Sequence, residues 1–519
     1  MLATLREVFF NLPALAAVAA GAVFMAVAFG LRAGRGRTAL WALLYLALLL
    51  HLVVFLNATL AYTVYPYEGK TVVEGVLLHN SLQYLQGEQP YAPPDQLPCR
   101  SLVYPPAYDM ALAGWLAVMG PTLYAARLFS LLCALATAFV CGLAVWRTTK
   151  HPPSAILGGL LVVCFYGVTG HWIEQVRNDA LMALLLALGM LLTARAVERR
   201  RMPVAGLVAL LLAVYTKQVA IFAPLAVIAY LWFHQSRRQA VIWAGAFGLA
   251  ALAIFGAMEF WSGGWFGFYI LKVPFRVGAD WSKFDLASTF FGAIWILLWA
   301  VLIVRVPAFQ KRPAPPAARL QALFLALAAP FCLLQSFKWG AALNAFAPAV
   351  PVFAVLGGCA FHELWRRFEG RDWLHLGLLG LALMQVAMLS YQPMLPSAAD
   401  IRAQQRIREW VSAAPGDAFV SVFSSHTLLA GKKYFGDDVQ VGDIAKAGEW
   451  RGGELVEKVR EQGFALMVLR PQIEPADLAD AVKANYVAAE RIPMRTSICR
   501  WPYMDVYVPR NAPWRPEER

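Results

Sequence analysis

Long apolar stretches separated by short polar loops make up the first three quarters of the chain. Twelve of them have the pattern of helices, at 12–31, 39–61, 122–146, 154–171, 179–196, 203–216, 218–233, 240–258, 289–305, 320–337, 341–363 and 373–391. Most are close to the roughly 20 residues that a helix needs to cross a bilayer. The two shortest, 203–216 and 218–233, are either separate spans or one broken or tilted pair. The pattern predicts a polytopic α-helical membrane domain over residues 1–395.

The pattern changes after this domain. Helix-like periodicity at 401–413, 452–462 and 475–485 alternates with strand-like runs at 418–423, 464–469 and 503–508. A segment of this length can bury a core of its own. We therefore expect residues 396–519 to form a separate α/β domain.

Composition and charge agree with a membrane protein. Of the 519 residues, 60% are hydrophobic and only 15% are charged, and the net charge is +13. The basic residues gather in alternate loops: Arg32, Arg35, Arg37; Arg147, Lys150; Arg195, Arg199, Arg200, Arg201; Arg237, Arg238; Arg305, Lys311, Arg312, Arg319; Arg366, Arg367, Arg371. This positive-inside pattern marks the cytoplasmic side and argues against nucleic-acid binding. Both termini are then outside, and for a bacterial inner membrane the C-terminal domain lies in the periplasm.

The first outer segment, 62–121, is long and has its own structure. Stretches 71–85 and 107–119 are amphipathic at helical spacing, and a turn rich in Gly and Pro separates them. Helices that are too short or too polar to span a bilayer are expected to lie along its surface. We predict that these two helices cover the outer end of the membrane domain.

Charged side chains also occur at the outer ends of the apolar stretches. They are Glu68, Glu74, Arg177, Asp179, Lys217 and Lys338. A charge near hydrocarbon costs roughly 2.5–3.5 kcal/mol on insertion scales, so such residues usually face a water-filled cavity with a function. Because both signs occur on one side, the sequence predicts a single polar chamber that opens outward.

Several short motifs in this region resemble a known family. They are Tyr67-Glu68-Gly69, Gly87…Pro90-Tyr91…Tyr104-Pro105-Pro106, Arg177-Asn178-Asp179, Thr216-Lys217-Gln218 and Lys338-Trp339-Gly340…Asn344…Pro348. Over residues 55–365, the order of these motifs and the side of the membrane on which they lie are similar to those in the GT-C glycosyltransferases that use polyprenyl-phosphate sugars. This family includes the protein O-mannosyltransferase and aminoarabinose transferase groups. The family often has an Asp-Glu pair where this chain has Tyr67 before Glu68.

The resemblance implies an inverting glycosyltransferase in the inner membrane. Its donor is a polyprenyl-phosphate sugar from the bilayer, and its acceptor is a periplasmic lipid, glycan or protein. A carboxylate beside the acceptor can remove its proton, and fixed cations can stabilise the leaving phosphate. We assign Glu68 as the base with Asp179 as the second carboxylate, and Arg177, Lys217 and Lys338 to the phosphate. Substrate contacts are expected from Tyr67, Glu74, Tyr104, Gln218 and Asn344. No cofactor is predicted, although this pattern leaves a divalent metal open.

Other interpretations remain at this stage. Asp179, Lys217 and Lys338 also suit a secondary transporter or lipid flippase, in which they form a pathway at the midplane. A scaffold that recruits partners through its C-terminal domain is a third interpretation. Arg177 can be a local partner of Asp179 at a helix start, and both lysines can extend to the headgroups.

The cysteines and the motifs that the sequence lacks limit the possible classes of protein further. Only Cys99 and Cys499 lie outside the predicted spans, where they either form a disulfide or stay unpaired. The sequence has no His-Glu-x-x-His, Gly-x-Ser-x-Gly or complete P-loop pattern. An ATP-driven pump and a serine hydrolase are therefore unsupported.

Overall fold

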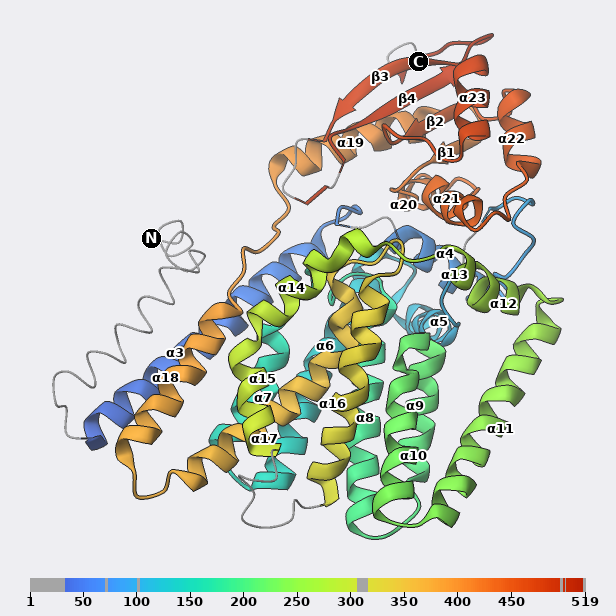
Figure 1. The fold of residues 1–519 in the computed structure, drawn as a ribbon. Coiled ribbons are helices and arrows are strands. Elements are labelled where there is room, and N and C mark those ends of the chain that lie inside the picture. Colours follow the sequence, from blue (N-terminus) through green and yellow to red (C-terminus); the bar gives the residue numbers. More distant parts are fainter. Residues whose placement is uncertain are drawn as a thin grey trace.

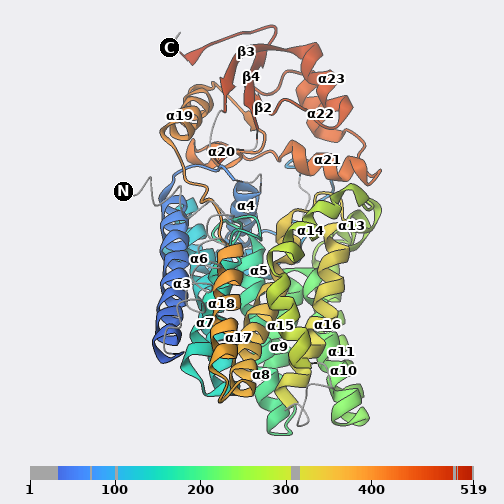
Figure 2. The same cartoon turned by 60° about the vertical axis from the view of Figure 1, so that its left-hand side comes forward.

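A helical bundle and a smaller α/β unit make up the molecule (Figures 1 and 2). The computed structural model describes residues 33–70, 73–99, 103–305, 316–494, 498–499 and 501–516. The expected span at 12–31 lies outside these ranges. We call the end of the bundle that the α/β unit covers the outer end, and the opposite end the inner end.

The bundle is built from helices that run between these two ends and shorter ones at the outer end. Their bounds are α3 Ala33–Val64, α4 Glu74–Leu85, α5 Ala107–Met119, α6 Leu123–Thr149, α7 Pro152–Cys164, α8 Asn178–Glu198, α9 Val204–Thr216, η1 Gln218–Ile221, α10 Phe222–His234, α11 Arg237–Trp261, α12 Trp265–Gly267, η2 Phe268–Lys272, α13 Val273–Arg276, η3 Trp281–Lys283, α14 Phe284–Ala293, α15 Trp295–Arg305, α16 Pro316–Ser336, η5 Leu343–Ala349, α17 Val350–Arg367 and α18 Asp372–Met388. Helices α4 and α5 lie within the stretches 71–85 and 107–119 where two helices were expected, and their position along the membrane surface stays a prediction.

The lengths of these helices test the predicted spans. In the described part of the chain, six helices are long and apolar enough to cross a membrane, or seven if one bent pair is a single span, and five more apolar helices are shorter. The bent pair falls where a continuous span at 289–305 was expected: Trp281–Ala293 and Trp295–Val304 meet at 64°. The expected total of twelve spans stays a prediction.

Small residues allow close packing inside the bundle. A Cβ on Gly142 of α6 would lie 3.1 Å from the carbonyl oxygen of Ala155 and 3.5 Å from the Cα atom of Gly159 in α7. Without side chains at these positions the two backbones can approach each other, which is how apolar helices pack when hydrophobicity alone does not drive them together.

The α/β unit contains a four-stranded sheet in the order β1-β2-β4-β3. Its elements are α19 Ala398–Ala413, β1 Ala418–Val420, α20 Ser425–Leu429, α21 Asp438–Lys446, α22 Gly453–Arg460, β2 Leu466–Leu469, α23 Ala476–Asn485, β3 Tyr486–Pro493 and β4 Tyr503–Pro509. Strand β1 pairs with β2 in parallel, and the two other pairs are antiparallel. The three helices and three strands expected from the sequence are present, while β3, α20 and α21 were not predicted.

Of the two alternatives that the sequence left open for Cys99 and Cys499, the disulfide is not formed. Alternate residues of a strand face opposite sides of a sheet. Cys99 lies in the cluster of Phe419 and Met467 on one face, where its N–H donates to the carbonyl oxygen of Phe435 at 3.0 Å. Cys499 packs against the cluster of Val420 on the other face. The sheet therefore separates the two thiols.

Candidate functional site

Glu68 lies between the bundle and the α/β unit. It follows α3 and precedes α4, and its side chain is completely buried. The N–H of Gly75 in α4 donates to Oε1 at 2.5 Å, and the N–H of Ser425 in α20 donates to Oε2 at 2.7 Å. Gln404 of α19 donates to the backbone carbonyl of Glu68 at 3.1 Å. One acidic residue thus joins the first outer loop to two helices of the α/β unit.

The environment of Glu68 favours its protonated form. Burial raises the pKa of Glu68 to about 7, although the hydrogen bonds from Ser425 and Gly75 stabilise the ionised form. Among the described residues no ion pair involves Glu68. A carboxyl group with a pKa near neutrality is suited to general acid–base work, because it both accepts and releases a proton at physiological pH.

Tyr67, an expected substrate contact, is part of the same junction. Its ring stacks on His426 of α20, with 5.4 Å between the ring centroids and 20° between the planes. The side chain of Tyr67 is buried. In this structure its ring therefore contacts the α/β unit, and on the bundle side it contacts Tyr65.

Glu74, which was expected to contact the substrate, is bound by other residues of the protein. Its carboxylate is completely buried and receives two hydrogen bonds from Arg127, at 2.9 and 2.8 Å. Tyr62 donates to it at 2.6 Å and the N–H of Val176 at 3.0 Å. Four donors saturate this carboxylate, so Glu74 holds together the outer ends of α3, α4 and α6 and the segment just before α8.

The sequence reading missed Arg127. This residue lies in the first turns of α6, completely buried, and its other N–H groups donate to the carbonyl oxygens of Tyr62, Tyr65 and Tyr67. A lone arginine inside an apolar stretch is itself a signal of function or of a buried partner, because a charge in that environment is costly.

A second buried pair was also missed. Lys70 of the first outer loop forms an ion pair with Glu174, and Tyr166 donates to the same carboxylate oxygen at 2.5 Å. The ammonium of Lys70 lies over the ring of Tyr62, 4.3 Å from the centroid. The side chain of Glu174 is fully buried.

Asp179 forms ion pairs with Arg177 and Lys217, two of the three predicted phosphate-binding residues. It lies in the first turn of α8, and Lys217 donates to it at 2.6 Å while Arg177 donates at 3.2 Å. Asn344 of η5 is 3.4 Å from both carboxylate oxygens. The local Arg177–Asp179 pair considered from the sequence is thus present, and two distant segments join it.

Aromatic and polar groups surround Lys217. Its ammonium lies 5.4 Å from the ring centroid of Tyr104, and the neighbouring Gln218 donates to the carbonyl oxygen of Val103 at 2.8 Å. Lys338 lies near enough for electrostatic interaction, because burial lowers the pKa of Lys338 and the charge of Lys217 lowers it further, while Asp443 opposes them. Two lysines that disfavour each other's charge form a place where an anion binds well.

The single chamber expected from the sequence does not appear as such. Among the described residues, no hydrogen bond or ion pair joins Glu68 to Lys217, Lys338 or Asp179. The outer polar layer consists of compact buried pairs around Arg127, Lys70 and Lys217 instead. Among the described residues, Glu68 differs from Glu74, Glu174 and Asp179 in that it forms no ion pair; Arg127 acts on it electrostatically but is paired with Glu74. In the described parts of the chain, no group of three or more His, Cys, Asp or Glu residues could hold a metal ion.

The tight contact at Gly75 gives a first prediction. A Cβ there would lie 2.4 Å from Oγ of Ser424 and 2.6 Å from N of Ser425. We expect Gly75→Ala to weaken the contact between α4 and α20 by about 1–3 kcal/mol, as overpacking does. Hydrogen exchange of the α20 amides should accelerate roughly 5- to 100-fold.

Gly114→Ala in α5 is the matched control, because a Cβ there meets nothing within 4 Å. If Gly75→Ala leaves the hydrogen-exchange rates of the α20 amides unchanged, the contact between α4 and α20 does not hold the α/β unit in place.

Comparisons with known proteins identify the fold. The sequence profile of a family described as dolichyl-phosphate-mannose-protein mannosyltransferase matches residues 103–261. The structure is similar to that of ArnT from Cupriavidus metallidurans bound to undecaprenyl phosphate, with 15% identity and a TM-score of 0.55 over 89% of this chain and 97% of that chain. The apo state of the same ArnT gives 14% identity and a TM-score of 0.56, with the same coverage. No curated protein sequence matches.

A third solved structure is more distant. It is the arabinosyltransferase EmbB from Mycobacterium smegmatis, with 14% identity and a TM-score of 0.40 over 71% of this chain and 33% of that chain. The family match and the ArnT-like fold confirm the predicted resemblance to GT-C glycosyltransferases, and they do not favour a transporter. The chain is a multi-pass membrane protein.

Proposed function

We propose that this protein is an inverting glycosyltransferase. It moves a sugar from a polyprenyl-phosphate donor to a lipid, glycan or protein acceptor on the periplasmic side of a bacterial inner membrane. The observation that carries the proposal is Glu68, a buried carboxylate that forms no ion pair with a described residue, at the end of the bundle where cations gather around Lys217. The ArnT-like fold supports it.

The donor phosphate is assigned to the cations around Asp179. Arg177 and Lys217 are fixed by their shared carboxylate, and Lys338 interacts electrostatically with Lys217. Cations that are held in place before the reaction stabilise a leaving phosphate without reorganisation. A polyprenyl chain would extend from this site into the bilayer.

Glu68 takes the acceptor proton in this mechanism. The acceptor oxygen or nitrogen forms a bond to the anomeric carbon while the bond from that carbon to the phosphate oxygen breaks. The proton goes to the carboxylate, the electron pair leaves with polyprenyl phosphate, and the sugar inverts. Each carboxylate oxygen of Glu68 accepts one backbone N–H here and retains a second lone pair for this proton.

Access to Glu68 requires a movement of the α/β unit. The carboxylate is fully buried beneath α20, so an acceptor reaches it only when α20 separates from α4. Lid movements of this kind, which exclude water and complete a site, are common in enzymes. The described arrangement then corresponds to the closed form.

Transfer of label in vitro tests the function. Purified protein in nanodiscs receives polyprenyl-phosphate carrying a radiolabelled hexose or pentose, together with an envelope extract as acceptor. We expect label in the extract and release of polyprenyl phosphate. Absence of both with every donor, from protein that stays folded, would overturn the proposal.

Lys338 provides a second prediction. Lys338→Gln removes one of the cations assigned to the phosphate without breaking the Lys217–Asp179 pair. Because a hydrogen bond to a charged group contributes about 1.5–3 kcal/mol, the KM for the lipid donor should rise at least roughly tenfold. Lys483→Gln, on the exposed side of α23, is the control. An unchanged KM in Lys338→Gln would remove this residue from the donor site.

A further inference from the structure

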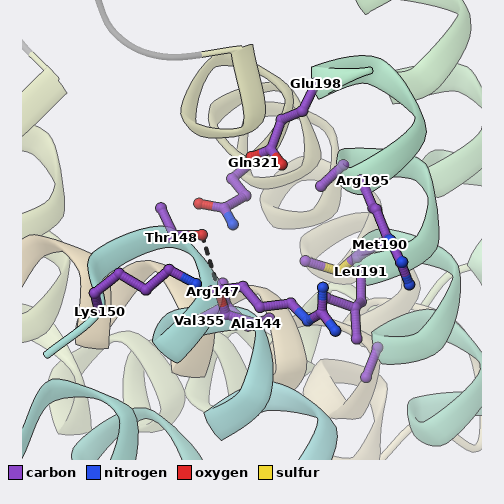
Figure 3. Close-up of a pocket in the computed structure, with 12 residues that line it drawn as sticks. Ala144, Arg147, Thr148, Lys150, Met190, Leu191, Arg195, Glu198, Gln321 and Val355 are labelled. Carbon is purple, nitrogen blue, oxygen red and sulfur yellow. Dashed lines mark hydrogen bonds between the residues drawn. The ribbon is translucent and has the colours of Figure 1, made fainter. Parts of the chain in front are cut away.

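A cavity lies at the inner end of the bundle, far from the α/β unit. It is bounded by α6, α8, α16 and α17 and has a volume of about 140 Å³ (Figure 3). This is roughly ten times the volume that holds one water molecule. Half of its twelve lining residues are apolar, and the other half are Arg147, Thr148, Lys150, Arg195, Glu198 and Gln321.

The charged residues of this cavity are not neutralised by one another. Arg147, Lys150, Arg195 and Glu198 make no ion pair with any described residue. Two of them, Arg195 and Glu198, are one turn apart on α8 and still do not pair. Three cations and one carboxylate therefore remain available to a ligand.

Gln321 supplies an independent observation. Its side chain is only 4% exposed, and its Oε1 has no hydrogen-bond partner among the residues that the structure describes. A buried acceptor left in this state costs about 1–3 kcal/mol. In Figure 3 the Gln321 side chain points into the space between Glu198 and Thr148. The cavity thus presents a neutral acceptor and a carboxylate beside its cations.

This combination selects the chemistry of a ligand. An anion alone would be repelled by Glu198 and would leave the Gln321 oxygen unsatisfied. A cation alone would meet three positive side chains. A phosphate joined to a primary ammonium satisfies both sets, because the phosphate accepts from Arg147, Lys150 and Arg195 and the ammonium donates to Glu198 and Gln321.

The position of the cavity identifies the source of such a group. It lies at the end of the bundle where the basic loops gather, and these loops mark the cytoplasmic side. Basic pockets between helices at this level bind lipid headgroups. We propose that the cavity binds the phosphoethanolamine headgroup of a phospholipid in the cytoplasmic leaflet.

Native mass spectrometry of the delipidated protein tests this proposal. Phosphatidylethanolamine, phosphatidylcholine and phosphatidylglycerol with identical acyl chains are added separately. Phosphatidylcholine has the same phosphate but no N–H donor, so we expect it to bind roughly tenfold more weakly than phosphatidylethanolamine. Equal binding of these two lipids, or a preference for phosphatidylglycerol, would overturn the proposal.

Substitutions locate the binding in the cavity. Glu198→Gln should lower phosphatidylethanolamine binding to the level of phosphatidylcholine and strengthen phosphatidylglycerol binding, because it removes the charge that repels an anion, whereas Arg195→Gln should weaken all three. Glu369→Gln, in the loop after α17, is the control. A preference for phosphatidylethanolamine that survives both cavity substitutions would place the lipid elsewhere and contradict the assignment.

Soluble phosphoethanolamine tests whether the ligand is a phospholipid of the membrane or the free compound. For a lipid site, millimolar phosphoethanolamine should displace little phosphatidylethanolamine, because it lacks the acyl chains that contact the apolar half of the lining. Tight binding of the soluble compound to protein that retains no phosphatidylethanolamine would contradict a lipid site.

Discussion

Glu68→Gln is expected to lower the rate of sugar transfer by about 10²–10⁴, the usual contribution of a general base. The amide has nearly the same shape as the carboxylate but cannot accept the acceptor's proton. Its nitrogen also cannot accept a backbone N–H, so the hydrogen bond from either Gly75 or Ser425 is lost as well. The measurement is release of polyprenyl phosphate under single-turnover conditions. Binding of the donor should change little, because Glu68 makes no described contact with Lys217 or Lys338.

Two variants separate chemistry from structure in this experiment. Glu88→Gln replaces an exposed acid in the same loop and should transfer at the wild-type rate. Gly75→Ala retains the carboxylate but places a Cβ against α20 and 2.9 Å from Oε1 of Glu68, so it measures the structural part of the loss and should lose far less activity than Glu68→Gln. A folded Glu68→Gln protein with wild-type turnover would remove Glu68 from the mechanism.

Arg127→Met is expected to destabilise the protein by about 3–5 kcal/mol, because it leaves the buried charge of Glu74 without its partner. Three backbone carbonyl groups of the first outer loop, at Tyr62, Tyr65 and Tyr67, lose their donor as well. The measurement is the thermal unfolding midpoint in detergent, followed by intrinsic fluorescence.

The double variant Arg127→Met with Glu74→Met tests the cause of this loss. Removing both charges should recover part of the stability, since no uncompensated charge remains. Arg37→Met is the control, because the Arg37–Asp372 pair is exposed and such pairs contribute about 0–1 kcal/mol. If the free energy of unfolding of Arg127→Met lies within 1 kcal/mol of the wild-type value, the buried Arg127–Glu74 pair does not hold the first outer loop in place.

Local sequence patterns predicted the helices that are marked by a continuous apolar stretch or by helical periodicity. Apolar stretches gave the positions of α6, α8 and α16, and helical periodicity gave α19. Strand β3 was missed because a bulge between Ala488 and Glu490 interrupts the alternation that identifies a strand. The bend between α14 and α15 was also missed, since an unbroken apolar run does not record a change of direction.

Which residues of the outer polar layer contact one another is decided by long-range packing, and local sequence does not show it. The cost of charge near hydrocarbon identified Asp179 and Lys217, which the structure brings together across 38 positions of sequence. The same argument identified Glu68, but its partner Ser425 is 357 positions away in a helix that was not predicted. The pairing of Glu74 with Arg127 likewise leaves no signature in local spacing.

The pH dependence of transfer tests the role of Glu68 most directly. Burial raises the pKa of Glu68 to about 7, and only its ionised form accepts a proton. The single-turnover rate of the wild type, measured from pH 5 to 9, should therefore rise about tenfold per pH unit at the acid end and become level above about pH 7. A rate that does not change across this range, or a folded Glu68→Gln variant with the same profile as the wild type, would contradict the proposed mechanism.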